Sequence, residues 1–244
     1  MDLALFDLDE TLISEDSTGL WLRWLVSQGF ASSDLIDEEQ ELMRQYYAGT
    51  LSIDEYMHKT LSPLTGMATM TVEGWVRRFI HRDIMPRVYP EARARLDWHQ
   101  ARGDRIIVIS ASGEHLVNLS PASSVPARVL AIGVEVVDER YSGNTYGTLT
   151  FQHGKVKRVE EWKAARPAET YAHTWAYSDS MNDLPMLAQA DYAHVINPAE
   201  PLLQEAEKRG WQVCHWALAE LTAGRAGVLR QPNPEQFTVS LIRQ

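Results

Sequence analysis

MDLALFDLDETLIS, residues 1–14, begins like a buried strand and then places two carboxylates two positions apart. The run LALF (3–6) is apolar, and Asp7 and Asp9 follow it. Moving a carboxylate from water into the protein interior costs free energy unless a partner compensates its charge. The stretch is therefore either a strand ending in a polar turn or the start of a metal site. An EF-hand calcium loop is disfavoured, because its sixth position requires glycine and holds Leu12 here.

The composition is that of an ordinary globular protein, with 45% hydrophobic and 23% charged residues. The formal net charge of −10 argues against a nucleic-acid binder, which usually has a basic face. The single cysteine, Cys214, excludes an intrachain disulfide. The N-terminus has no secretory signal pattern, and no apolar run is long enough to span a bilayer. We therefore expect a cytoplasmic protein whose partner is a small molecule, not a nucleic acid or a membrane.

Residues 16–84 contain only helical patterns, at 17–29, 34–49, 52–61 and 71–84. Gly29 and Gly49 are typical helix stops, and Ser52 with Glu55 forms a capping box. Asp16 or Ser17 is the expected cap of the first helix. This stretch is predicted to be a helical domain inserted after the first strand.

Beyond residue 85, strand and helix patterns alternate. Strands are expected at 105–110, 132–137, 174–178 and 193–196, a hairpin at 140–151, and helices at 90–103, 114–119, 155–165 and 182–190. Such alternation predicts an α/β fold with a doubly wound parallel sheet. The predicted domains are an α/β core formed by 1–15 and 85–218, the helical insertion 16–84, and a tail, 219–244, to which no pattern assigns a structure.

Three polar segments each follow a predicted strand: DLDET (7–11), SASG (110–113) and SDSMND (178–183). The carboxyl ends of parallel strands form the ligand-binding edge of such sheets, so these segments are expected to meet. Each has a simpler explanation by itself. Ser110 is typical of a helix cap, Asp179 of a first-turn acid, and Lys155, in HGK, of a solvated surface residue.

Together the segments provide what phosphoryl transfer requires. Asp7, Asp9 and Asp179 would repel one another unless a cation lay between them, and carboxylate oxygens suit Mg²⁺. One carboxylate could act as nucleophile and a second as general acid and base. Ser110 and Lys155 would hold phosphoryl oxygens.

The motifs ALFDLDETL, VISASG, GKVKRVEEW and YSDSMNDLPML resemble those of the haloacid dehalogenase-like superfamily, and most closely its subfamily IB, the phosphoserine-phosphatase-like hydrolases. The resemblance covers roughly residues 3–215, with four motifs in order. It implies a Rossmann-like core, a helical cap over residues 16–84, Mg²⁺, and hydrolysis of a small phosphorylated metabolite through an aspartyl-phosphate.

The resemblance also implies roles for individual residues. Asp7 would attack phosphorus, and Asp9 would act as general acid and base. Mg²⁺ would be held by the Asp7 carboxylate, the Asp9 backbone carbonyl and Asp179. Asp183 would either bind the metal through water or orient Lys155, which is preferred to Lys157 because it follows a glycine and opens a helix. The expected phosphoryl-binding groups are Ser110, the backbone N–H groups around Ala111 and Ser112, and Asn182.

The match departs from phosphoserine phosphatases in the insertion. These enzymes have a cap glutamate for the substrate ammonium, and Asp16 lies near that place. They also use a cap arginine for the substrate carboxylate, and LSPLTGM (61–67) contains none. Possible substitutes are Arg44, Arg77 and Arg78. The insertion is instead rich in aromatic residues that either pack its helices or contact an organic leaving group: Trp21, Trp24, Tyr46, Tyr47, Tyr56 and Trp75.

The leading hypothesis is a Mg²⁺-dependent phosphatase for a small organic phosphomonoester, and the departures in the insertion disfavour phosphoserine as that substrate. A lipid-phosphate phosphatase or a phosphotransferase would use the same residues. A phospho-aspartate receiver module is disfavoured, because such a domain is about half as long and has no helical insertion. A non-hydrolytic binding protein is disfavoured because all the expected reactive residues are present.

Overall fold

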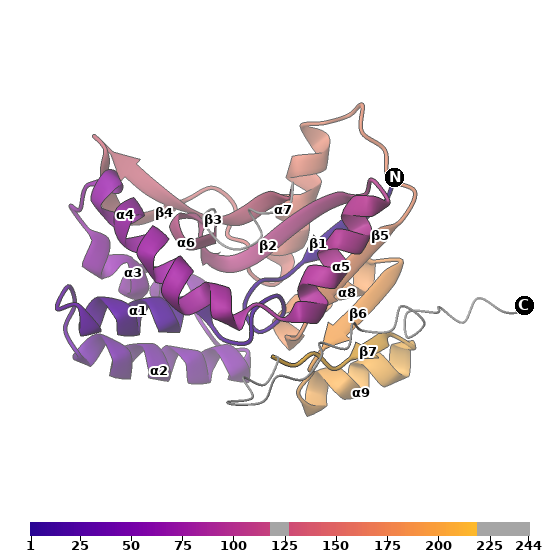
Figure 1. The fold of residues 1–244 in the computed structure, drawn as a ribbon, viewed down its shortest axis with the longest axis horizontal. Helices are drawn as coiled ribbons and strands as arrows, with labels where there is room; N and C mark the ends of the chain where they lie inside the picture. The colour runs from indigo at the N-terminus through magenta and orange to yellow at the C-terminus, as the bar shows by residue number, and fades with distance from the viewer. Residues whose placement is uncertain (118–126, 219–244) are drawn as a thin grey trace, which may run out of the picture.

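The structure, a computed structural model, describes residues 1–117 and 127–218. Its centre is a seven-stranded sheet in the order β4-β3-β2-β1-β5-β6-β7 (Figure 1). The strands are β1 Leu3–Phe6, β2 Arg105–Gly113, β3 Arg128–Val137, β4 Arg140–Tyr146, β5 Thr174–Ser178, β6 Tyr192–Ile196 and β7 Gln212–Cys214. All neighbouring strands are parallel except the β3–β4 pair. The expected α/β fold with a mostly parallel sheet is confirmed.

β1 lies between β2 and β5, and both of its faces are covered. Leu3 and Leu5 pack in one apolar cluster with residues of α7 (His153–Ala164), α8 (Leu184–Gln189) and α9 (Glu200–Arg209). Ala4 and Phe6 pack on the opposite face with residues of α5 (Pro90–Ala101). A strand buried on both faces needs apolar side chains at every position, which explains the continuous run LALF.

Four helices follow β1: α1 (Ser17–Ser27), α2 (Asp34–Ala48), α3 (Ile53–Leu61) and α4 (Thr69–Phe79). We call residues 17–84 the helical segment; it lies beside one end of the sheet (Figure 1). The Asp16 side chain caps α1, Ser52 Oγ accepts from the Glu55 N–H, and Gly49 ends α2 in the left-handed conformation. Trp21, stacked on Trp24 and near Phe79, is part of the interior of this segment.

The helical segment is attached to the sheet at two places. The chain enters the segment near Ser14 and leaves it near Arg87, and these two stretches are hydrogen-bonded to each other. The Ser14 N–H donates to the Arg87 carbonyl, and the Tyr89 N–H donates to the Leu12 carbonyl. Separately, the β3–β4 hairpin pairs with residues 66–69. The bonds run from Gly66 N–H to Tyr141 O (2.8 Å), from Tyr141 N–H to Met67 O (3.0 Å) and from Thr69 N–H to Glu139 O (2.9 Å).

Several elements differ from the sequence expectations in their bounds. β2 continues to Gly113, three residues beyond the apolar run, and β3 begins at Arg128 instead of 132. α4 begins at Thr69 and continues as a wider turn through Ile80–Ile84. α9 and β7 were not predicted at all. Residues 118–119 of the expected helix and the tail from 219 lie outside the described residues. Among the described helices, none combines the length and apolar character that crossing a bilayer demands.

Candidate active site

The polar segments after β1, β2 and β5 meet at one edge of the sheet, as their positions predicted. Parallel pairing aligns Phe6 with Val108 on one side and with Tyr177 on the other. The Asp7 N–H continues this ladder with a 3.0 Å bond to the Tyr177 carbonyl. Asp7 therefore extends from the end of the central strand, with the DLDET, SASG and SDSMND segments around it.

Lys155 lies inside this group and not on the surface. Its Nζ atom is 2.7 Å from Asp7 Oδ1 and 2.7 Å from Asp183 Oδ2, and its side chain is 3% exposed. Burial alone would lower the pKa of Lys155, but the Asp183 and Asp7 carboxylates raise it above its ordinary value, so Lys155 is a cation. Ser178 Oγ also donates to Asp183 Oδ2, at 2.8 Å. Of the two roles expected for Asp183, its contacts match the orientation of Lys155.

The Asp7 carboxyl is buried and only partly compensated. Burial, together with the Asp183 and Asp9 charges, raises the pKa of Asp7 to about 7 against the opposing effect of Lys155. Lys155 occupies Oδ1, whereas Oδ2 accepts only a longer bond, 3.3 Å, from Thr11 Oγ1. Oδ2 is thus the less engaged of the two oxygens.

The Asp9 carboxylate is held from two sides. The Ser17 N–H donates to Oδ1 at 2.7 Å. Ser112 Oγ donates to Oδ2 at 2.8 Å, and Ser110 Oγ lies 3.3 Å from the same oxygen. The Ser110 hydroxyl also accepts a bond from the Ser112 N–H, at 3.0 Å. Ser110 is therefore a buried residue of β2 next to Asp9, and not a helix cap.

Asp179 completes the acidic edge. Thr11 Oγ1 is 2.9 Å from Asp179 Oδ1 and accepts from the Asp179 N–H at 3.1 Å. Burial raises the pKa of Asp179 well above its ordinary value, and the nearby Asp7 and Glu10 carboxylates add to this. Thr11, for which no role was predicted, connects Asp7 to Asp179. Its position as the hydroxyl residue at the end of DLDET is the sequence signal that could have identified it.

These carboxylates fit a hard cation, although they do not form a closed cage. Within residues 1–117 and 127–218 no three acidic, histidine or cysteine side chains are grouped closely enough to hold a metal by themselves. The Asp7 carboxylate nevertheless raises the pKa of Asp179, and the Asp183 and Asp9 carboxylates raise that of Asp7, which indicates unbalanced negative charge at the edge. Mg²⁺ usually takes only one or two carboxylates and keeps several waters, so this donor set suits it.

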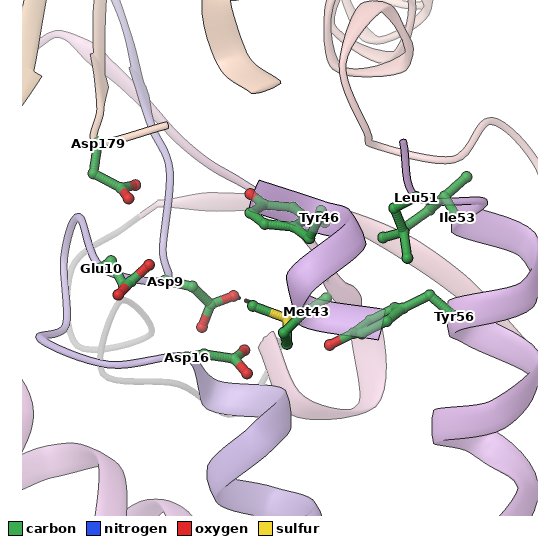
Figure 2. Close-up of a pocket in the computed structure, with 11 residues that line it drawn as sticks. Asp9, Glu10, Asp16, Met43, Tyr46, Leu51, Ile53, Tyr56 and Asp179 are labelled. Carbon is green, nitrogen blue, oxygen red and sulfur yellow. Dashed lines mark hydrogen bonds between the residues drawn. The ribbon is translucent and has the colours of Figure 1, made fainter. Parts of the chain in front are cut away.

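A pocket opens beside Asp9, between the sheet edge and the helical segment. Four acids (Asp9, Glu10, Asp16 and Asp179) lie toward one side, and apolar and aromatic residues of α2, α3 and the loop between them lie toward the other (Figure 2). The second group comprises Met43, Tyr46, Leu51, Ile53 and Tyr56, and Ala111 and Ser112 complete the lining. None of the described residues that line this pocket is lysine, arginine or histidine.

Asp16 has a second carboxyl beside it. Glu39 of α2 is 4% exposed and hydrogen-bonds to Asp16, and Arg23 lies close enough to lower the Glu39 pKa. Burial, with the charges of Asp9 and Glu39, raises the pKa of Asp16 to about 8. Gly19 gives these groups room, because a Cβ there would lie 2.6 Å from Asp16 Oδ2.

The remaining candidate residues differ in whether they lie near the site or on the surface. Asn182 accepts from Gln152 Nε2 at 3.0 Å and donates to the Tyr46 carbonyl at 3.3 Å, so it lies where the sheet meets α2. Lys157 is exposed and pairs with Glu161. The three candidate arginines are surface residues outside the pocket, two of them paired with acids of their own helices: Arg44, Arg77 and Arg78.

The aromatic residues of the helical segment divide between packing and lining. Trp75 stacks on Phe30, with ring centroids 4.0 Å apart, and the two buried tryptophans pack inside the segment. The exposed Tyr47 donates to Glu10 at 3.1 Å. Only Tyr46 and Tyr56 line the pocket. The sequence could not distinguish these groups, because the face that each residue presents depends on tertiary packing.

Comparisons with known proteins agree with this geometry. The haloacid dehalogenase-like hydrolase family profile matches residues 4–188. A histidinol-phosphatase from Neisseria meningitidis is 33% identical over 221 residues, covering 88% of this chain and 99% of that protein. A protein of unknown function from Bordetella pertussis has a similar structure, with a TM-score of 0.79 and 31% identity over 87% of this chain and 97% of the other. A phosphoserine phosphatase, solved as an analogue of its phospho-aspartyl intermediate, shares the fold at 20% identity, with a TM-score of 0.64 and coverage of 88% and 92%.

Proposed function

This chain belongs to the haloacid dehalogenase-like hydrolases and is a phosphoric monoester hydrolase; from that premise we propose that it uses Mg²⁺ and an aspartyl-phosphate at Asp7 to cleave a small organic phosphate. The observation that carries this proposal is the contact set of Asp7. One of its oxygens is bonded to a buried lysine, and the other faces the acidic edge with only a long contact to Thr11.

In the first step, Asp7 Oδ2 bonds to phosphorus while the bond from phosphorus to the ester oxygen breaks. Asp9 transfers its proton to the departing oxygen, so the alcohol leaves neutral. The Lys155 cation holds Asp7 Oδ1 and keeps Oδ2 directed at the substrate. Backbone N–H groups at 111–112 and the Ser110 hydroxyl are the proposed donors to the phosphoryl oxygens.

In the second step, Asp9 takes a proton from water as the water oxygen bonds to phosphorus. The bond between phosphorus and Asp7 then breaks, which releases inorganic phosphate and restores both carboxyl groups. Asp7, the Asp9 backbone carbonyl and Asp179 would hold Mg²⁺, whose charge would offset that of the phosphoryl group. We also propose that the helical segment acts as a cap that limits access of water and substrate.

Replacing Asp7 by Asn tests the nucleophile. The substitution keeps the shape of the side chain and the contact with Lys155, so the fold should remain while turnover of p-nitrophenyl phosphate falls by about 1,000-fold or more. The assay is steady-state hydrolysis with Mg²⁺ and with chelator. Asp97→Asn, on the exposed surface of α5, is the matched control. Undiminished Mg²⁺-dependent turnover by Asp7→Asn would contradict the mechanism.

The pocket supports a substrate that carries an amine and lacks a carboxylate. Glu10 and Asp16, the two lining acids with no part in the proposed chemistry, favour a cation, and none of the described lining residues could balance a carboxylate. Tyr46 and Tyr56 provide flat apolar surface for a ring or chain. The Neisseria meningitidis relative is named for histidinol phosphate, an amino-alcohol ester of this kind. We therefore propose an amino-alcohol phosphate, with histidinol phosphate as the first candidate.

A small substrate panel tests this class. We expect kcat/KM to fall in the order histidinol phosphate, ethanolamine phosphate, ethyl phosphate and phosphoserine. The first two bring a cation to the acids without a carboxylate, whereas phosphoserine adds a carboxylate that none of the described lining residues could balance. Asp16→Asn should lower kcat/KM for the amines about tenfold, the cost of a hydrogen bond to a charged group, with little effect on ethyl phosphate. Asp37→Asn, on the exposed side of α2, serves as control. Phosphoserine as the best substrate would exclude the proposed class.

A further inference from the structure

A continuous row of buried hydroxyl groups connects Asp9 to the helical segment. The Tyr56 side chain of α3 lies beside Thr18 of α1 and borders the pocket. Thr18 Oγ1 lies 3.1 Å from Ser112 Oγ, which lies 2.8 Å from Asp9 Oδ2. Two distant segments, α1 and β2, thus contribute one hydroxyl each to a chain that ends on the proposed general acid and base, and the Tyr56 side chain lies at its other end.

The direction of this chain is set by its last member. In its ionised form the Asp9 carboxylate only accepts hydrogen bonds, so Ser112 must then donate to Asp9 and accept from Thr18. The hydrogen of the Thr18 hydroxyl is then engaged, so Thr18 could only accept from the neighbouring Tyr56 hydroxyl. Bonds arranged head to tail in a buried environment strengthen one another. All three hydroxyl residues are less than 9% exposed, at 6% for Tyr56, 6% for Thr18 and 4% for Ser112.

The two ends of the chain lie where chemistry and recognition are proposed. Tyr56 forms part of the pocket wall that would contact the organic group of the substrate, and Asp9 borders the same pocket (Figure 2). Thr18 follows Asp16 in the first turn of α1, so the chain also passes next to the proposed amine site. An occupant of the pocket would contact both ends at once.

We propose that Ser112, Thr18 and Tyr56 are positioning residues that set the orientation of the Asp9 carboxyl and make it depend on the placement of the helical segment. This inference rests on the proposed role of Asp9 as general acid. Without Ser112, Oδ2 would keep only the 3.3 Å contact with Ser110, and Oδ1 would keep its bond from the Ser17 N–H. The carboxyl could then rotate away from the leaving oxygen.

Leaving-group dependence distinguishes this role from a structural one. A p-nitrophenyl ester releases a stable anion and needs little help from an acid, whereas p-nitrobenzyl phosphate, of nearly equal shape, releases an alkoxide that must be protonated. The ratio kcat/KM reports the step in which the leaving group departs. A residue that only supports the fold would change both substrates equally.

Ser112→Ala should lower kcat/KM for p-nitrobenzyl phosphate about tenfold or more and that for p-nitrophenyl phosphate by less than about threefold. Tyr56→Phe keeps the ring and should produce the same pattern with a smaller loss. Because both act through one chain, the double variant should resemble Ser112→Ala alone. Ser112→Thr, which retains a hydroxyl, should restore the ratio of the two substrates.

Two further variants make the result decisive. Thr60→Val removes a buried hydroxyl of α3 that bonds only to carbonyls of its own helix, and it should leave the substrate ratio unchanged. Asp9→Asn should itself slow the benzyl ester far more than the phenyl ester; if it slows both equally, the acid role of Asp9 fails. If Asp9→Asn shows the expected selectivity and Ser112→Ala does not, or if the losses of Ser112→Ala and Tyr56→Phe add, the positioning chain is refuted.

Discussion

Asp16 combines two roles in one side chain. Its two carboxylate oxygens accept from the Thr18 and Gly19 N–H groups, at 3.1 and 2.8 Å, and so begin α1. The same carboxyl borders the pocket, next to the buried Glu39. A capping residue needs only an oxygen acceptor, which serine or asparagine would also supply. The presence of an acid here, among other acids, therefore points to a role in binding charge.

The raised pKa of Asp16 predicts a pH dependence of stability. The native state holds the Asp16 proton more tightly than the unfolded chain does, because burial and neighbouring charges move the pKa from 3.8 to about 8. The free energy of unfolding should therefore fall as pH rises from about 4 to 8. Asp16→Asn, which keeps the cap, should have a shallower slope over this range. Urea unfolding at several pH values, without Mg²⁺, measures it.

Asp16→Ala is the matched comparison for this experiment. It removes the cap as well as the charge, so its free energy of unfolding should be about 1 kcal/mol lower than that of Asp16→Asn at every pH. The two variants should share the shallower slope. A slope for Asp16→Asn as steep as that of the wild type would show that Asp16 titrates in the native state much as it does in the unfolded chain.

At the scale of single residues, the sequence located the acids better than their partners. Asp7, Asp179 and Lys155 could be found because each directly follows a strand pattern or a glycine, and Asp9 because it lies two positions after Asp7. Chain connectivity fixes those places. Glu39 follows neither a strand pattern nor a glycine, so its position in the sequence does not mark it as a site residue. It lies on α2 with the buried Leu35 and Leu42, among surface-type acids, and only packing decides which acid is turned inward.

Among the elements, α7 has the most constrained beginning. Gln152 precedes it with a positive φ of 48°, and a Cβ on Gly154 would lie 1.9 Å from the Leu149 carbonyl oxygen. The chain can make this close approach only with glycine. The approach sets the first turn of the helix, from which the Lys155 side chain reaches Asp7.

Gly154→Ala should therefore disturb both fold and site. The added methyl group meets backbone and not a flexible side chain, so we expect a loss of about 1–3 kcal/mol in stability. Lys155 should shift with the helix, and kcat should fall about tenfold or more. Chemical denaturation and p-nitrophenyl phosphate turnover are the measurements.

Gly74→Ala in α4 is the control for this substitution. A Cβ there meets nothing within 4 Å, and alanine favours a helix, so stability should rise by about 0.5–1 kcal/mol with activity unchanged. If Gly154→Ala behaved like Gly74→Ala, the close approach would have no influence on the position of Lys155.

Element types were predictable where periodicity and stop signals agreed. β5 has the expected bounds, and α2 ends at Gly49 as its sequence predicts. Errors arose where tertiary pairing overrides local pattern. β2 runs past its apolar residues because the SASG segment is still extended, and its pairing with β3 shifts register between Ile109 and Gly113. The short β7 forms because β6 offers a free edge, which local sequence does not report.

For the whole molecule, the alternation of strands and helices was enough to predict the sheet and the place of the helical insertion. It could not predict how the insertion is attached. The pairing of residues 66–69 with the β3–β4 hairpin joins segments about seventy positions apart, and it uses backbone groups that carry no side-chain signature. Only the three-dimensional arrangement reveals that this hairpin of the sheet also supports the helical segment.

That attachment has a consequence for how such proteins diversify. An insertion joined only at its two ends could be exchanged between relatives as a cassette, and substrate range would change with it. Here a graft of residues 14–88 alone would leave the Tyr141 N–H and the Tyr141 and Glu139 carbonyls without their partners. The inherited unit is therefore discontinuous: the helices that form the pocket and the hairpin encoded some fifty residues later must change together.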